Sequence, residues 1–272
     1  MRRAFRHLGP LWPALFGAWA ARIWVSTRRF DPPRREGPWL QSAQQVRLQL
    51  AGFPVMTYQW GEPDRPLVVL VHGWNGRGSQ MAAFAEPLVE AGFRVLGFDA
   101  PGHGQTPGRA TNIFEIRDVL KAIAAQVAPL HGIVAHSFGG MVASLALSEG
   151  LKARRVVLLS TPANFEMLIR HFCRALQVPA AVQARLQQHL ARRFGDGLGE
   201  RVSTTHTCQT LSRVAALLLH DEDDHDVPLA QAEQIHRHWP GSQLHVTRRL
   251  GHKRLLYNPK VIQQVVAFIR EN

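Results

Sequence analysis

The stretch GIVAHSFGGMVASLALS, residues 132–148, contains two apolar runs joined by a short segment with Ser137 in it. Residues 132–135 are a short continuous apolar segment typical of a buried strand, and residues 141–148 favour a helix. A strand that turns into a helix over one residue pushes that side chain out of the sheet edge, and only small neighbours leave room for the turn. Ala135 and Gly139 are such neighbours. Ser137 is therefore the best candidate nucleophile in the chain.

Further apolar runs place this turn in a sheet. Two of them, residues 46–50 and 55–60, alternate around Ala51-Gly52 as an antiparallel pair does. The others are residues 67–71, 94–98, 132–135, 155–159, 214–219 and 243–246, which are separated mostly by helix-length stretches. Continuous apolar runs are typical of parallel strands that are covered on both faces. The sequence predicts an α/β fold with a mostly parallel sheet and helices on both faces.

One connection is too long for a single crossover helix. Residues 162–212 carry apolar side chains at helical spacing, which predicts two or three helices inserted above the sheet as a small cap. We therefore expect an N-terminal segment at 1–45, a core made of residues 46–161 and 213–272, and a helical cap at 162–212.

Composition restricts the classes of function. The 272 residues are 46% hydrophobic, so the chain can bury one large core, and its formal net charge is +12. The basic residues are scattered along the sequence and are not gathered into one stripe with interleaved aromatics, which argues against a nucleic-acid partner. Cys173 and Cys208 are isolated, so neither a disulfide framework nor a zinc site is expected.

The N-terminus allows several interpretations. Residues 1–7 are basic, residues 8–21 are apolar, and Ala18-Trp19-Ala20 resembles a signal cleavage site, so export is one alternative. Because prolines interrupt the run and its large apolar side chains recur at helical spacing, we favour an amphipathic helix in a cytoplasmic protein, followed by a Pro/Arg-rich linker at 28–38. The helix either packs on the domain or makes peripheral contact with the inner membrane. In the second case, deletion of residues 1–38 would leave a folded, active core.

A serine nucleophile needs a base and an acid that orients the base. His252 follows the last predicted strand and is the candidate base. The candidate acids lie between Ser137 and His252 in sequence, in the run LHDEDDHDVP at residues 219–228. Its aspartates are Asp221, Asp223, Asp224 and Asp226. The order serine, aspartate, histidine is thus satisfied.

Together these motifs resemble the α/β-hydrolase superfamily. The motifs are His72-Gly73-Trp74 after the third strand, Asp99-Ala-Pro-Gly-His-Gly104 after the fourth, the serine turn, Asp-x-x-Val-Pro at 224–228 and the terminal Gly251-His252. The resemblance covers residues 46–272 and implies an α/β-hydrolase fold with an eight-stranded sheet, acyl-enzyme chemistry, no cofactor and no metal. It also implies that Trp74 and Phe138 supply backbone N–H groups to an oxyanion hole. Ser137 is then the nucleophile, His252 the base and Asp224 the acid, with Asp223 as the alternative one residue away.

The sequence therefore predicts a serine hydrolase that cleaves a small-molecule carboxylic ester, either a carboxylesterase or a lysophospholipase-like enzyme. Acyl transfer and thioester or amide hydrolysis use the same residues and stay open. A non-catalytic scaffold that binds a membrane or a partner is the alternative from another class. His72, His103 and His136 are expected to be structural, bonding loop backbone. Nothing in the sequence specifies the oligomeric state.

Overall fold

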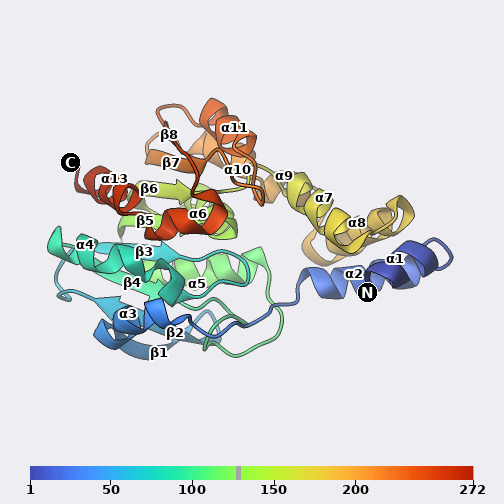
Figure 1. Ribbon diagram of the computed structural model, residues 1–272, viewed down its shortest axis with the longest axis horizontal. Helices are drawn as coiled ribbons and strands as arrows, with labels where there is room; N and C mark the ends of the chain where they lie inside the picture. Colours follow the sequence, from blue (N-terminus) through green and yellow to red (C-terminus); the bar gives the residue numbers. More distant parts are fainter. Residues whose placement is uncertain (127–129, 272) are drawn as a thin grey trace.

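The computed structural model describes residues 1–126 and 130–271. The centre of the fold is one eight-stranded sheet (Figure 1). The strands are β1 (Gln44–Leu50), β2 (Phe53–Trp60), β3 (Leu67–Val71), β4 (Arg94–Phe98), β5 (Leu130–His136), β6 (Ala153–Leu159), β7 (Ala215–Asp221) and β8 (Gln243–Thr247). Their order is β1-β2-β4-β3-β5-β6-β7-β8. Strand β2 runs antiparallel to both of its neighbours, β1 and β4, and the other neighbouring pairs are parallel. The predicted mostly parallel, eight-stranded α/β fold is confirmed.

Helices lie on both faces of this sheet and in a lobe beside it (Figure 1). They are α1 (Arg2–Leu8), α2 (Pro13–Trp24), α3 (Gly37–Ser42), α4 (Ala85–Glu90), α5 (Ile113–Ala125), α6 (Phe138–Ser148), α7 (Phe165–Leu176), α8 (Ala180–Phe194), α9 (Leu198–Val202), α10 (Thr204–Thr207), α11 (Ala230–His238), α12 (Gly251–Arg254) and α13 (Pro259–Arg270), with 3₁₀ turns at Arg34–Glu36, Gly78–Phe84, Cys208–Thr210 and Leu255–Tyr257. Helices α5, α6 and α11 pack on one face, and α4 and α13 pack on the other.

Strand β3 shows why the central runs are continuously apolar. Its alternate side chains Leu67, Val69 and Val71 join the core beneath α5 and α6, while Val68 and Leu70 join the core beneath α4 and α13. All five are buried. Because successive side chains of a strand point to opposite faces, a strand covered twice needs apolar residues at every position.

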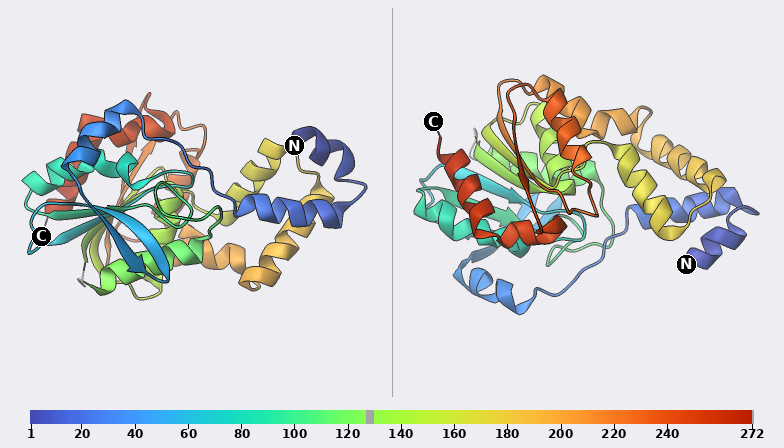
Figure 2. Two further views of the ribbon diagram at one scale, coloured as in Figure 1. Left: turned by 90° about the horizontal axis from the view of Figure 1, so that it is seen from below. Right: turned by 45° about the horizontal axis from the view of Figure 1, so that its top comes forward.

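Helices α7 and α8 form a lobe that projects from the sheet together with α1 and α2 (Figure 2), whereas α10 packs on α6 and α11 beside the sheet. Helix α2 lies along α8, and the two backbones approach closely at Gly17. A Cβ atom on Gly17 would lie 2.3 Å from the Cβ of Arg185, so no larger residue fits there without moving the helices apart. Phe5, Phe16 and Ala20 are buried in the same lobe. The N-terminal helix therefore packs on the domain, which was one of the two expected placements, and it is not a separate surface helix.

The segment expected to be a linker is partly structured. Residues 34–42 are helical, and the Glu36 side chain is fully buried. Its carboxylate pairs with the Arg77 guanidinium and accepts a 2.7 Å hydrogen bond from the Ser79 hydroxyl. A buried carboxylate requires such partners because burial removes its hydration. Nothing near Glu36 in sequence indicates these partners, so the contact was not predicted. None of the helices in the described ranges has the length and apolar composition needed to cross a bilayer.

Candidate active site

Ser137 sits at the junction of β5 and α6 in a strained backbone conformation. Its φ and ψ angles are 54° and −123°, in a region that side chains other than glycine rarely adopt. The turn is held by a 2.8 Å hydrogen bond from the Ser137 N–H to the Leu159 carbonyl. A Cβ atom on Gly139 would lie 2.6 Å from the carbonyl oxygens of Val71 and His72. Helix α6 therefore begins against the end of β3, and only glycine allows that approach.

The structure brings three sequence-predicted side chains into one hydrogen-bonded chain. The Nε2 atom of His252 lies 3.0 Å from Ser137 Oγ, and its Nδ1 atom lies 2.8 Å from Asp224 Oδ2. The second carboxylate oxygen, Asp224 Oδ1, accepts the N–H groups of Val227 and Asp226 at 2.9 and 3.0 Å. Burial alone would raise the pKa of Asp224, but the hydrogen bond and charge of His252, together with the other hydrogen bonds to the carboxylate, outweigh burial and hold that pKa below its usual value.

The neighbouring aspartates have other partners. The Asp223 carboxylate is exposed and accepts the Arg249 N–H at 2.8 Å. The buried Asp221 carboxylate accepts the N–H groups of Gly251 and Leu250 at 2.8 and 3.1 Å. These bonds, opposed by burial, lower the pKa of Asp221. Asp221 thus anchors the loop that carries His252, a role that its place among the four aspartates of the run did not indicate.

The turn after β3 lies against the serine. A Cβ atom on Gly73 would be 3.0 Å from Ser137 Cβ, and the rings of Trp74 and Phe138 meet edge to face at 5.2 Å. Within residues 1–126 and 130–271, neither the Trp74 N–H nor the Phe138 N–H donates to a protein acceptor. Both N–H groups that the sequence resemblance assigned to an oxyanion hole are thus unpaired in this part of the chain.

Two buried histidines shape that turn. The His72 Nδ1–H donates to the Gly73 carbonyl at 2.7 Å, and its Nε2 atom accepts the Ala100 N–H at 3.0 Å. The His103 Nε2 atom accepts the Asn75 N–H at 3.0 Å. Burial lowers the pKa of His72 to about 4 and that of His103 to about 3, so both rings are neutral. Both histidines therefore bond loop backbone, as expected.

His136 lies next to the candidate base. Its Nε2–H donates to the His252 carbonyl at 2.9 Å, and the two ring centroids are 4.7 Å apart. Burial, with a contribution from the charge of His252, lowers the pKa of His136 to about 3. A neutral ring here does not repel a protonated His252. His136 therefore helps to position the base.

His220, in the same run as the candidate acids, is buried and bonds the loop backbone. The His220 Nε2–H donates to the Val227 carbonyl at 2.7 Å and lies 3.6 Å from Asp224 Oδ2. Among the residues that the structure describes, no group of three or more His, Cys, Asp or Glu side chains is arranged to hold a metal ion.

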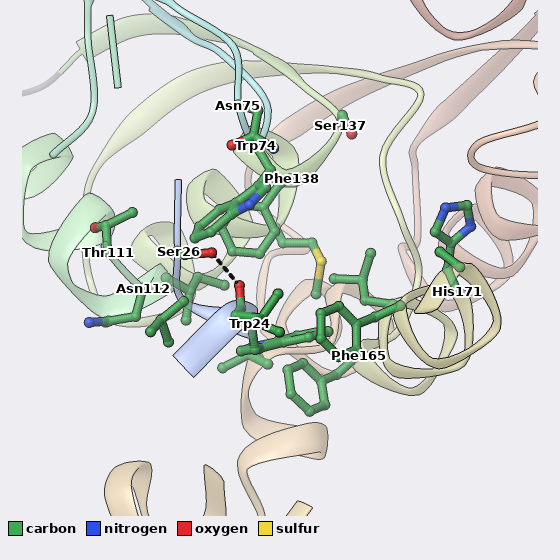
Figure 3. Close-up of a pocket in the computed structure, with 18 of the residues that line it drawn as sticks. Trp24, Ser26, Trp74, Asn75, Thr111, Asn112, Ser137, Phe138, Phe165 and His171 are labelled. Carbon is green, nitrogen blue, oxygen red and sulfur yellow. Dashed lines mark hydrogen bonds between the residues drawn. The ribbon is translucent and has the colours of Figure 1, made fainter. Parts of the chain in front are cut away.

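A pocket of about 440 Å³ opens beside Ser137 (Figure 3). Its walls are mostly apolar and come from the core, from α7 and α9 of the cap, and from α2. Trp24 of α2 packs edge to face against Phe165 and Phe172 of α7, with ring centroids 5.5 and 5.2 Å apart. Across the pocket lie Trp74 and Phe138. The N-terminal segment thus forms part of the pocket. The sequence did not indicate this, because an amphipathic pattern shows that a helix has an apolar face but not which segment packs on that face.

Comparison with known proteins gives the family. The sequence model described as the alpha/beta hydrolase fold matches residues 66–208. A pimeloyl-acyl-carrier-protein methyl ester esterase of Aromatoleum aromaticum is 38% identical over 103 residues, which are 38% of this chain and 40% of that protein. The enzyme of the same name from Neisseria meningitidis is 29% identical over 223 residues, which cover 68% of this chain and 86% of that protein.

Solved structures agree on the fold. A crystal structure described as a bacterial membrane phospholipase A superposes with a TM-score of 0.67 at 18% identity, covering 97% of this chain and 95% of that one. At this identity the likeness concerns the fold alone. Because the family model spans more than half of the chain, and the sheet and the serine turn have the arrangement that the sequence resemblance implied, the chain belongs to the α/β-hydrolase fold family.

Proposed function

We propose that the protein is a serine hydrolase that cleaves a carboxylic ester through an acyl-enzyme intermediate. One observation carries the proposal: the hydrogen-bonded chain from Ser137 through His252 to Asp224 ends at an apolar pocket. Relatives named as methyl ester esterases support the ester linkage as the substrate bond.

The first half of the reaction acylates the serine. His252 Nε2 takes the Ser137 hydroxyl proton while Oγ attacks the ester carbonyl, and the negative charge on the carbonyl oxygen is stabilised by the N–H groups of Trp74 and Phe138. Asp224 stabilises the resulting imidazolium through its bond to Nδ1. The C–O bond of the ester then breaks, and His252 returns the proton to the departing alcohol.

The second half releases the acid. Water attacks the acyl carbonyl of the acyl-enzyme, His252 accepts a proton from that water, and the same two N–H groups stabilise the second oxyanion. The bond between the acyl carbon and Ser137 Oγ breaks, and the serine regains its proton. Ester and water are thereby converted to carboxylic acid and alcohol with no other reactant.

The pocket favours an apolar acyl group. Its volume of about 440 Å³ lies within the ordinary range for small-ligand sites, and the aromatic side chains of Trp24, Phe165 and Phe172 line it. Polar side chains at its rim include Asn112 and Ser26. We infer that a single acyl chain occupies the apolar part, which suits a carboxylesterase or a lysophospholipase-like enzyme.

A non-catalytic scaffold fits less well. A scaffold does not require the strained backbone of Ser137 or a buried aspartate aligned on a histidine, and both features cost stability. Thioesterase and acyltransferase activities use the same geometry and differ in the leaving group or the acceptor, so they are outcomes of the substrate assay.

The test combines a covalent probe with turnover. A fluorophosphonate should label the wild-type protein, and Ser137→Ala should abolish labelling and lower p-nitrophenyl ester hydrolysis by about three orders of magnitude or more. Ser148→Ala is the matched control, because Ser148 lies on the same helix α6 and its hydroxyl donates to the Leu145 carbonyl. Labelling that persists in Ser137→Ala would contradict the proposal.

A further inference from the structure

The turn between α1 and α2 carries unusual side chains for a protein surface. In the described part of the chain, seven large hydrophobic side chains are exposed, and five of these lie within residues 1–15. Leu11 and Leu15 are each 66% exposed, Trp12 is 54% exposed and Leu8 is 43% exposed. We call residues 8–15 the hairpin tip. A cluster of this kind marks an interaction surface, whereas single exposed apolar residues do not.

The hairpin tip is held in place by packing and does not fold back to bury these side chains. Phe5 and Phe16, which flank the tip, are buried, and Trp19 stacks on Phe5 with ring centroids 4.8 Å apart. The tip lies at the end of the lobe farthest from the sheet in both figures of the whole chain (Figures 1 and 2). The end of the lobe therefore exposes an apolar surface formed by the hairpin tip.

The charge around the tip identifies that partner. Residues 1–24 and 165–194, which include helices α1, α2, α7 and α8 of the lobe, contain nine arginines and a single carboxylate, Glu166. Arg2, Arg3 and Arg6 are exposed on α1, directly before the tip. An exposed apolar group containing tryptophan, next to a surplus of cations, is the combination that binds anionic lipid bilayers.

We propose that the hairpin tip inserts into the headgroup region of an anionic lipid bilayer. Leu11, Trp12 and Leu15 enter the apolar boundary, and the arginines of α1 face the lipid phosphates. In this placement α2 does not lie flat on the membrane, because its apolar face packs on α8 and is not free to contact lipid. Helix α2 has twelve residues, so the tip is about 18 Å from Trp24, which lines the pocket. Bilayer binding would thus hold the pocket close to the lipid surface.

Vesicle binding tests the proposal separately from hydrolysis. Full-length Ser137→Ala protein, which leaves the lipids intact, is sedimented with vesicles of phosphatidylglycerol and phosphatidylcholine, and with vesicles of phosphatidylcholine alone. We expect clear binding to the anionic vesicles, weakened by salt, and little binding to the neutral ones.

Variants of the tip then locate the contact. Leu11→Ser with Leu15→Ser should lower the partition coefficient by about tenfold or more, because two leucine side chains no longer leave water. Arg3→Gln with Arg6→Gln should lower it by roughly fivefold per arginine. Val246→Ser is the matched control, since Val246 is 47% exposed on β8, away from the lobe. Hydrolysis of a soluble short-chain ester by the leucine variants with Ser137 restored checks that the fold is intact.

Three results would overturn the proposal. They are unchanged vesicle binding by the leucine variant, equal binding to neutral and anionic vesicles, and a wild-type dimer without vesicle affinity that the leucine substitutions dissociate. Each leaves the proposed ester hydrolysis untouched, because the short-chain assay measures it independently.

Discussion

Replacing Asp224 by asparagine separates the candidate acid from its neighbour. In the structure, Asp224 Oδ1 accepts two backbone N–H groups and Oδ2 faces His252 Nδ1. An asparagine keeps its carbonyl oxygen on the two N–H donors, so its NH₂ group must face His252. The ring can then only accept at Nδ1, which places its proton on Nε2. A ring protonated at Nε2 cannot take the Ser137 proton.

The expected loss follows from this change of tautomer. A triad aspartate changed to asparagine costs about four orders of magnitude in kcat, equivalent to about 5 kcal/mol of transition-state stabilisation. Asp223→Asn is the matched control. Its exposed side chain accepts the Arg249 N–H and has no bond to His252 among the residues described, so kcat should change by no more than a few fold. Steady-state hydrolysis of a p-nitrophenyl ester measures both variants.

The result that refutes this reasoning is equally specific. If Asp223→Asn is inactive while Asp224→Asn retains near wild-type kcat, the acid is one residue earlier than the geometry indicates. If both variants stay active, neither carboxylate orients His252 during turnover. Circular dichroism and thermal unfolding of each variant exclude loss of folding as the cause of a lowered kcat.

Three further changes test the surroundings of the site. Deletion of residues 1–30 removes the buried Phe5 and Phe16, together worth about 3–6 kcal/mol, so Tm should fall and pocket-dependent activity should be lost; an unchanged Tm would contradict the packing of α2 on α8. Leu168→Trp fills the pocket and should lower kcat/KM for octanoyl esters about tenfold or more while sparing acetyl esters; equal effects on both would place the acyl chain elsewhere. The folded-state pKa of Asp221 lies below the unfolded value of about 3.9, so its stabilising effect is present above that pH and lost as pH falls through the folded pKa. Asp221→Asn should therefore lower Tm at pH 7 and flatten the fall of Tm below about pH 4, and a wild-type Tm at pH 7 would speak against the anchoring role.

The sequence predicted those features that depend on local pattern. Continuous apolar runs indicate strands buried on both faces, and this pattern can be read from the local sequence without knowledge of distant contacts. The turn at Ser137 was equally readable, because the small residues Ala135 and Gly139 are needed wherever a strand meets a helix so abruptly. The order of Ser137, Asp224 and His252 suggested a triad, and the structure places Ser137 and Asp224 each within hydrogen-bond distance of His252. Their catalytic roles stay predictions.

Contacts between distant segments were not readable. Glu36 pairs with Arg77, and no sequence pattern links these two distant residues. The stripe on α2 indicated an apolar face, but it did not show that α8 covers this face or that Trp24 reaches the pocket. Asp221 was one of four aspartates in a single run, and only its bonds to the loop before His252 reveal its role. Such features are set by tertiary packing.

Capture of the acyl-enzyme tests the central claim most directly. The protein is mixed with a p-nitrophenyl ester, quenched with acid during turnover and digested, and the mass of the peptide that contains Ser137 is measured. Acylation of Ser137 predicts a mass increase equal to the acyl group minus one hydrogen on that peptide, appearing within the first turnover and absent in Ser137→Ala. Steady ester hydrolysis with no acylated peptide, or with the acyl group on a different residue, would contradict the proposed mechanism.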